Sequence, residues 1–234
     1  MWKAESGGRK LSFHLAGINN ENFIMQDDQT GSWWQQASGE AIAGPLRGQH
    51  LELVFHDEVS FATWKQEQPR GRVLRPEESA PWRKFSKDWE VETATLPVVT
   101  PRLPGGEPLP AREVVVGVRA GGEARAFPLT KVRQQSPLLD TLGGTPLLLV
   151  MGDDGRSVRA FDRRLDGREL RLFARPGSQP LRLVDAETRS EWSFTGEAVS
   201  GPLAGKRLAK VYVLLDYWFD WRTYNPRTTV YRRG

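Results

Sequence analysis

The sequence predicts a mainly β protein of the β-rich α+β kind, in which two related units with short helices form a pseudo-two-fold arrangement. Three observations predict this fold. A string that runs from Asp27 to Leu51 recurs in modified form from Asp185 to Leu208. Apolar runs of strand length alternate with Gly-Gly and Asp-Gly turn signals. Helical spacing of apolar residues is confined to short segments, so we expect helices to be minor elements.

The second half of the chain carries the strand signals in order. The runs EVVVGVRA and EARAFPL flank Gly121-Gly122, which predicts a hairpin. The runs PLLLVM and RSVRAFDR flank residues 152–155 and predict a second hairpin. The run DGRELRLF begins at the turn signal Asp166-Gly167 and predicts another strand. KRLAKVYVLL (206–215) predicts a last strand, which aligns with the earlier run QHLELVFH (49–56).

Three short segments have helical signals. PLTKVRQQ starts with a proline, which is favoured in the first turn of a helix. DYWFDWRTYNP places Tyr217, Trp221 and Tyr224 at i, i+4 and i+7 and ends at a proline. Its counterpart in the first half, EVSFATWKQEQP, places Phe61 and Trp64 at i and i+3. Aromatic stripes at this spacing predict packing into a core.

The two copies of the string define the organisation of the chain. Trp34 aligns with Trp192 and, further along, Trp64 aligns with Trp221. The segment from Glu113 to Arg164 has no counterpart before Met1, so we expect the first unit to be truncated. We therefore predict three segments and expect the two units to pack on each other. These are residues 1–77, the back half of the first unit; residues 78–110, a Pro-rich connection; and residues 111–234, the complete second unit.

Ten residues of the repeated string are candidate binding residues. They belong to a polar turn, the strand after it and a glutamate beyond: Asp27, Thr30, Ser32, Trp34 and Glu40 in the first copy, and Asp185, Thr188, Ser190, Trp192 and Glu197 in the second. One interpretation is a duplicated polar site, because paired carboxylates can divide acid and base roles. We favour turn capping, because Asp and Thr side chains hydrogen-bond nearby backbone N–H groups. The sequence assigns no catalytic residue.

The histidines do not predict a metal site. His50, Glu52 and His56 share one face of the expected strand, but His50 and His56 would lie about 20 Å apart at ~3.3 Å per residue. The second copy does not retain this set, and His14 has no partner motif. GVRAGGEA lacks the Lys-Ser/Thr pair of a phosphate-binding loop and predicts a hairpin turn instead. We predict neither a metal nor a cofactor.

Composition and charge exclude several classes of protein. The chain contains no cysteine, which excludes disulfides, thiolate nucleophiles and Cys-bound metals among these residues. No apolar run approaches the roughly 20 residues of a membrane span. The net charge of +4 is divided as −3 over residues 1–110 and +7 over residues 111–234. The arginines are scattered rather than clustered, which argues against a nucleic-acid partner.

The motifs together resemble a known family. VVVGVRAGGEARAFPL, DTLGGTPLLLV, RAFDRRLDGRELRLF, DDQTGSWWQQASGEAIAGPLRGQHLEL and YWFDWRTYNPRTTVY look like the prokaryotic domain-of-unknown-function family numbered 3179. The resemblance covers nearly the whole chain. It implies two tandem copies of one unit, and export or membrane anchoring, hence a periplasmic or cell-envelope location. The family's Cys-x-x-Cys motif would fall before Met1, so no residue of that motif is carried over.

Two functional hypotheses follow from the sequence. The first is a non-catalytic binding or scaffold domain of an exported or envelope protein, because no catalytic constellation is evident. The alternative is part of a metal- or thiol-dependent redox protein or enzyme whose Cys-x-x-Cys segment lies upstream of this chain. The sequence names no ligand, partner or oligomeric state.

Overall fold

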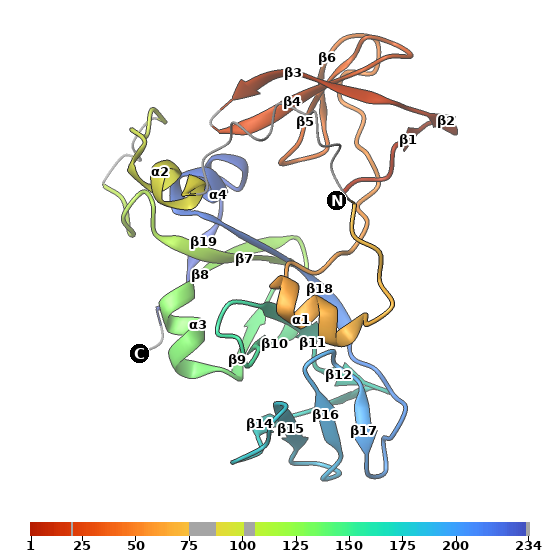
Figure 1. Cartoon of the computed structure of the whole chain (residues 1–234), viewed down its shortest axis with the longest axis vertical. Coiled ribbons are helices and arrows are strands. Elements are labelled where there is room, and N and C mark those ends of the chain that lie inside the picture. The colour runs from red at the N-terminus through yellow and green to blue at the C-terminus, as the bar shows by residue number, and fades with distance from the viewer. Residues whose placement is uncertain (20, 75–87, 101–105, 233–234) are drawn as a thin grey trace.

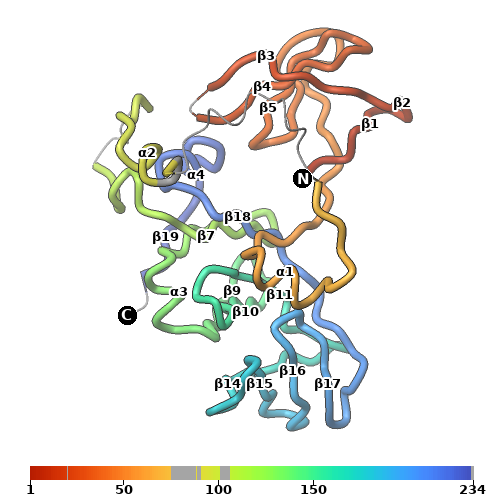
Figure 2. Tube along the Cα trace, viewed as in Figure 1, coloured from red at the N-terminus to blue at the C-terminus, as the bar shows by residue number. Residues whose placement is uncertain are grey.

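The computed structural model describes residues 1–19, 21–74, 88–100 and 106–232. Three bodies follow one another along the longest axis (Figure 1): a four-stranded sheet, a central seven-stranded sheet and a second four-stranded sheet. The chain builds the first small sheet, descends to helix α1 beside the central sheet, and later leaves the central sheet to build the second small sheet (Figure 2). The protein is therefore mainly β, as predicted.

The central sheet has the strand order β19-β8-β7-β18-β11-β10-β9. Every pair in it is antiparallel except β19 with β8. Both hairpins predicted from the sequence are present, as β7-β8 and β10-β11. The bounds are β7 (Val114–Ala120), β8 (Glu123–Pro128), β9 (Leu138–Leu142), β10 (Thr145–Met151), β11 (Val158–Asp162), β18 (Ala209–Tyr217) and β19 (Thr229–Val230).

The central sheet curls until its two sides meet. Arg125 of β8 forms an ion pair with Asp140 of β9 and donates to the carbonyl of Thr141 at 3.1 Å. Helix α3 (Leu129–Gln135) packs against β7, β8 and β10 and buries Leu129 and Val132. The enclosed core contains apolar side chains from all of these elements, among them Val116, Val118, Phe127, Leu147, Leu149 and Tyr231. Burial of this core supplies the main stabilising free energy of the central body.

The two small sheets have the same strand order and only antiparallel pairs. In both, the register shifts between the third and fourth strands, at Trp33/Trp34 and at Glu191/Trp192. A short hairpin of two strands, each two residues long, precedes each sheet. The first set is β1 (Glu5–Ser6), β2 (Arg9–Lys10), β3 (Phe13–Asn19), β4 (Asn22–Asp27), β5 (Trp33–Gln35) and β6 (Ala41–Ala43). The second is β12 (Arg164–Leu165), β13 (Arg168–Glu169), β14 (Leu172–Ala174), β15 (Arg182–Asp185), β16 (Glu191–Ser193) and β17 (Ala198–Ser200).

The three predicted helices are confirmed as α1 (Phe61–Glu67), α3 and α4 (Trp218–Tyr224). A fourth helix, α2 (Trp89–Thr95), lies in the predicted Pro-rich connection, of which residues 75–87 and 101–105 are outside the described residues. None of the described helices has the length and apolar character needed to cross a bilayer.

Three expectations about these elements were wrong. Residues 49–56 form no strand; within the described residues they make only the bridges Glu40–His50 and Trp2–Leu53. Their counterpart β18 is a strand because β7 and β11 pair with it on both sides. The run DGRELRLF is split between β13 and β14. The aromatic stripes also differ, because Trp221 is buried against Gly117 whereas Phe61 is 62% exposed.

Candidate functional site

The repeated polar turn forms the same hydrogen-bond network in both small sheets. The buried Asp27 carboxylate accepts from the backbone N–H of Thr30 at 2.5 Å and from its hydroxyl at 2.8 Å. It also accepts from the indole N–H of the buried Trp34 at 2.8 Å. In the second sheet, Asp185 accepts from Thr188 N–H at 2.6 Å and from the Trp192 indole at 2.9 Å. Each network is closed within its own turn.

The serine of each turn fastens the following loop. Ser32 Oγ lies 2.7 Å from the Thr30 hydroxyl and accepts from the backbone N–H of Leu46 at 3.0 Å. Ser190 makes the corresponding contacts, 2.7 Å to the Thr188 hydroxyl and 3.0 Å to the backbone N–H of Leu203. These bonds satisfy buried polar groups. The geometry supports turn capping as the role of these residues.

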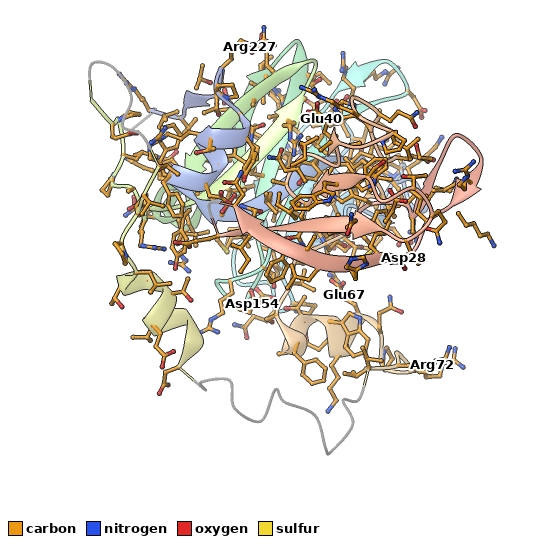
Figure 3. All side chains as sticks on the ribbon, turned by 90° about the horizontal axis from the view of Figure 1, so that it is seen from above. Asp28, Glu40, Glu67, Arg72, Asp154 and Arg227 are labelled. Carbon is orange, nitrogen blue, oxygen red and sulfur yellow. The ribbon has the colours of Figure 1, made fainter. Side chains whose placement is uncertain are left out.

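The two glutamates of the candidate set lie apart from the buried turns. Glu40 is 3.9 Å from His50, and Glu197 pairs with Arg207 at 2.7 Å on the surface. Figure 3 shows Glu40 well separated from Asp28, which follows the polar turn aspartate of the same sheet. The structure therefore places the ten candidate residues in two buried networks and two surface pairs, and not in one joint cleft.

Hydrogen bonds within the first small sheet account for the lowered pKa of Asp27. Burial alone would raise the pKa of Asp27, but hydrogen bonds from Trp34 and Thr30 bring it below its usual value. The histidines are spread over three separate contacts: His14 with Asp28 at 2.7 Å, His50 with Glu40, and His56 with Glu58 at 3.8 Å. In the part of the chain that the structure describes, no group of His, Asp or Glu side chains is placed to hold a metal ion.

A different part of the molecule forms a cleft with unusual chemistry. It has a volume of about 390 Å³ and lies where the β3–β4 turn meets β18 and α4. That size falls within the range of small-molecule sites. Its lining includes the polar residues Glu21, Asn22, His56, Glu58, Asp216 and Asp220 and the aromatic residues Trp2, Tyr212, Tyr217 and Phe219.

Asp216 and Asp220 form the chemical centre of this cleft. Asp216 is the last residue but one of β18, and Asp220 lies in the first turn of α4; the two side chains are close enough to interact directly. Burial and the charge of Asp220 together raise the pKa of Asp216 to about 8. Burial also raises the pKa of Asp220 to about 6, against a hydrogen bond from Asn22 at 2.5 Å that lowers it. The two carboxyls titrate as a pair and hold a proton between them near neutral pH.

One oxygen of this pair has no ordinary donor. Asp220 is 7% exposed, and among the described residues its Oδ1 accepts no hydrogen bond from an N–H or hydroxyl group. The donor that the pair itself can supply is the proton of Asp216. Buried polar atoms are nearly always satisfied, so the shared proton is the donor expected for this buried oxygen. Asp216 is less deeply buried and lines the cleft, so it is the carboxyl of the pair that a ligand reaches first.

Contacts between the first sheet and α4 hold the cleft in shape. Arg112 donates to Glu21 in the β3–β4 turn at 2.7 and 3.3 Å and lies over the rings of Tyr217 and Phe219, 5.1 and 5.2 Å from their centroids. The Tyr224 hydroxyl donates to the carbonyl of Asn19 at 3.2 Å. Segments some 200 positions apart in sequence are thereby fixed against each other, which preorganises the cleft.

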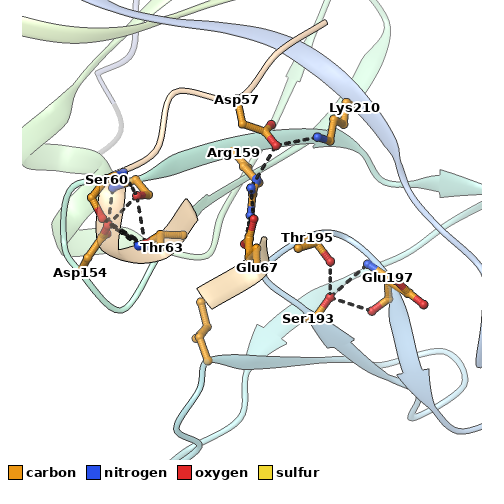
Figure 4. Close-up of polar contacts among 12 residues, drawn as sticks. Asp57, Ser60, Thr63, Glu67, Asp154, Arg159, Ser193, Thr195, Glu197 and Lys210 are labelled. Carbon is orange, nitrogen blue, oxygen red and sulfur yellow. Dashed lines mark hydrogen bonds and ion pairs between the residues drawn. The ribbon is translucent and has the colours of Figure 1, made fainter. Parts of the chain in front are cut away.

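A second cleft, of about 440 Å³, occupies the corresponding place on the other small sheet. It is lined by Thr63 and Glu67 of α1 together with Arg182 and Phe194 of the second sheet. A dense polar network holds α1 there (Figure 4). Thr63 donates to Asp154 at 2.9 Å in this network. Hydrogen bonds from Ser157 and Ser60 keep the pKa of Asp154 low, although burial alone would raise it.

Sequence reasoning missed Asp216 and Asp220. Both lie in the segment DYWFDWRTYNP, which the sequence analysis treated only as an aromatic core stripe. The sequence did contain one sign of this pair: two carboxylates four residues apart in an otherwise aromatic segment. Like charges at this spacing destabilise a helix, so their presence suggests a functional role.

Fold and site together define a class of protein: a mainly β protein with a buried carboxyl pair in the cleft between its first small sheet and α4. The family model described as Protein of unknown function (DUF3179) matches residues 1–228, so the chain belongs to this family. No curated protein and no solved structure matches the chain.

Proposed function

We propose that the protein is a non-catalytic binding module that takes a small ligand in the cleft between the first four-stranded sheet and α4. The observation that carries this proposal is the Asp216–Asp220 carboxyl pair, which lines the cleft although Asp220 is only 7% exposed. The side chains of the repeated polar turns already hydrogen-bond within each small sheet, which supports a structural role for these turns. We propose that these turns belong to two copies of one unit.

Comparison of the two clefts supports a functional role for the carboxyl pair. In the proposed alignment of Trp64 with Trp221, Asp220 corresponds to Thr63 and Asp216 to Val59. The second cleft is built without either carboxyl group. The architecture therefore does not require two adjacent acids at these positions, although they carry a large desolvation cost. A cost of this kind that the fold does not need is typical of functional sites.

The cellular context is proposed from the family. Resemblance of the motifs to the family implies a periplasmic or cell-envelope protein, and we propose this location. Fractionation of cells that express the native gene, with antibody detection, tests it; recovery only in the cytoplasmic fraction would contradict it. The redox alternative concerns a Cys-x-x-Cys segment outside these residues, and no described residue supports it.

A ligand screen tests the proposed function. Wild-type protein and the Asp220→Asn variant are compared by thermal shift against a broad panel of neutral, cationic and anionic metabolites and glycan fragments. We expect at least one compound to raise the Tm of the wild type but not of Asp220→Asn. Asp166→Asn is the matched control, because Asp166 is an exposed turn residue at φ 48° whose conformation Asn tolerates equally well. Hits that stabilise all three proteins equally, or no hits at all, would overturn the proposal.

A further inference from the structure

We infer that the ligand of this cleft is a small organic cation, an alkylammonium ion with an apolar body, bound by Asp220 and Asp216. This inference rests on the proposed function and names the class of ligand. It is drawn from the charges of the lining residues, the aromatic walls and the adjacent carboxyls of Asp216 and Asp220.

The charged groups around the carboxyl pair leave a negative site. Glu21 on the first sheet is neutralised by Arg112 at 2.7 Å, and Glu58 accepts from the backbone N–H of Leu215 at 3.1 Å. On the cationic side, the amino group of Met1 lies 3.0 Å from His56 Nδ1, and burial lowers the pKa of this amine. Among the described residues that line the cleft there is no arginine or lysine. A cation is thus favoured and an anion is repelled.

The walls favour an organic cation over a hydrated ion. Tyr217 and Phe219 stack with ring centroids 6.1 Å apart, and Tyr212 and Trp2 line the same cleft. Arg112 already lies over Tyr217 and Phe219, and Arg119 lies over Tyr212, so these rings serve to bury the carbon atoms of a ligand's apolar body. The described side chains contain no set of ligands placed for a metal ion. An ammonium group donates up to three hydrogen bonds and needs no coordination sphere, so it suits two adjacent carboxyls.

Binding replaces the proton that the pair shares. In the empty cleft Asp216 holds the proton, because burial and the charge of Asp220 raise its pKa to about 8. When R–NH₃⁺ enters, its N–H groups donate to both carboxylates, and Asp216 releases one proton to solvent. No bond of the ligand is made or broken, and the charge balances because one ammonium replaces one proton. Binding should therefore strengthen as the pH rises from 5.5 to 8.5. The other titratable groups that face this cleft are Glu21, Glu58, His56, Tyr212 and the Met1 amine.

The test compares three probes of one shape: benzylamine, benzyl alcohol and benzoate. Each is titrated calorimetrically into wild-type protein at pH 8.0. We expect benzylamine to bind at least ten-fold more tightly than benzyl alcohol, and benzoate not to bind. The benzylamine titration repeated at pH 7.0 in two buffers of different ionisation enthalpy should show close to one proton released per benzylamine bound. Asp220→Asn and, separately, Asp216→Asn should each weaken benzylamine at least ten-fold, and Asp166→Asn should leave it unchanged.

The outcomes separate this inference from the proposed function. Equal binding of benzylamine and benzyl alcohol, or tighter binding of benzoate, overturns the cation class; if that binding is still lost in Asp220→Asn, the binding module stands. Absence of benzylamine binding overturns the inference, and the broad screen then decides the binding module alone. Because the wild-type comparison of the three probes needs no variant, the result holds even where a variant folds poorly.

Discussion

The guanidinium of Arg159 binds both carboxylate oxygens of Glu67, at 2.6 and 2.7 Å, although the two residues are 92 positions apart in sequence. Arg159 lies on β11 with its side chain 4% exposed, and Glu67 ends α1. A third group, Asp57, lies 3.0 Å from the same guanidinium and also accepts from Lys210 at 2.7 Å. This bidentate pair joins the chain that leaves the first sheet to the central sheet (Figure 4).

Loss of this buried arginine should destabilise the protein. Arg159→Met leaves Glu67 without its partner while keeping most of the side-chain volume, so we expect the free energy of unfolding to fall by about 3 kcal/mol. The matched control is Arg164→Met, which breaks an exposed pair with Asp162 and should lower the free energy of unfolding much less. Urea denaturation measures both. Equal effects of the two substitutions would contradict a special role for the buried pair.

The same argument applies to the polar turns. Asp27→Ala leaves the buried Trp34 indole and the Thr30 N–H without an acceptor, which should cost about 2 kcal/mol. Asp185→Ala should cost a similar amount, because its contacts match in type and length. Chemical denaturation gives the two free energies, and the ligand screen repeated on both variants checks function. Loss of ligand binding at equal stability would show that these aspartates form a site.

Two glycines that follow the first polar turn, Gly44 and Gly48, test how tightly the loop packs on that turn. Gly44 has φ +90°, and a Cβ there would lie 2.7 Å from the Ser32 Cα, a backbone atom. Gly48 has φ +82°, but a Cβ there meets nothing within 4 Å. Both Gly44→Ala and Gly48→Ala strain the backbone, and only the first also creates a clash. We therefore expect a markedly lower Tm for Gly44→Ala than for Gly48→Ala; similar values would mean that the loop relaxes freely.

Local signals accounted for much of the fold. Gly121-Gly122 predicted its hairpin correctly, because a turn with φ > 0 is encoded by the residues themselves. Asp27 and Thr30 likewise suggested a capped turn, and the hydrogen bonds have that form. Features that depend on long-range partners were not predictable. Residues 49–56 have the same pattern as β18 but lack neighbouring strands, and a strand requires them.

The carboxyl pair shows why the cleft was missed. Asp216 and Asp220 are separated by four residues, but their high pKa values depend on burial beneath the first sheet. Asn22, which hydrogen-bonds Asp220, comes from a position 198 residues away. Sequence spacing shows that two acids share a face, but it does not show what covers them. Only the packing of the first sheet against α4 turns this pair of ordinary surface residues into a candidate site.

Asp216 should make the stability of the protein fall as the pH rises. Its pKa is raised to about 8, so between about pH 4 and pH 8 the folded state keeps a proton that the unfolded chain has released. The free energy of unfolding therefore decreases through this window, by at most about 1.4 kcal/mol per pH unit for one such group. Asp216→Asn removes the titration, so the variant should gain stability relative to the wild type as the pH rises.

The measurement is urea denaturation of the wild type and Asp216→Asn at pH 5.0, 6.5 and 8.5. Asp154, whose low pKa contributes stability that is lost only in acid, does not titrate in this range. His56, Glu21 and Glu58 face the cleft in both proteins, so the difference between the two curves reports the titration of the coupled Asp216–Asp220 pair. That difference should grow with pH in favour of the variant. Parallel curves would mean that Asp216 is ionised throughout, and the shared proton on which amine binding depends would then be absent.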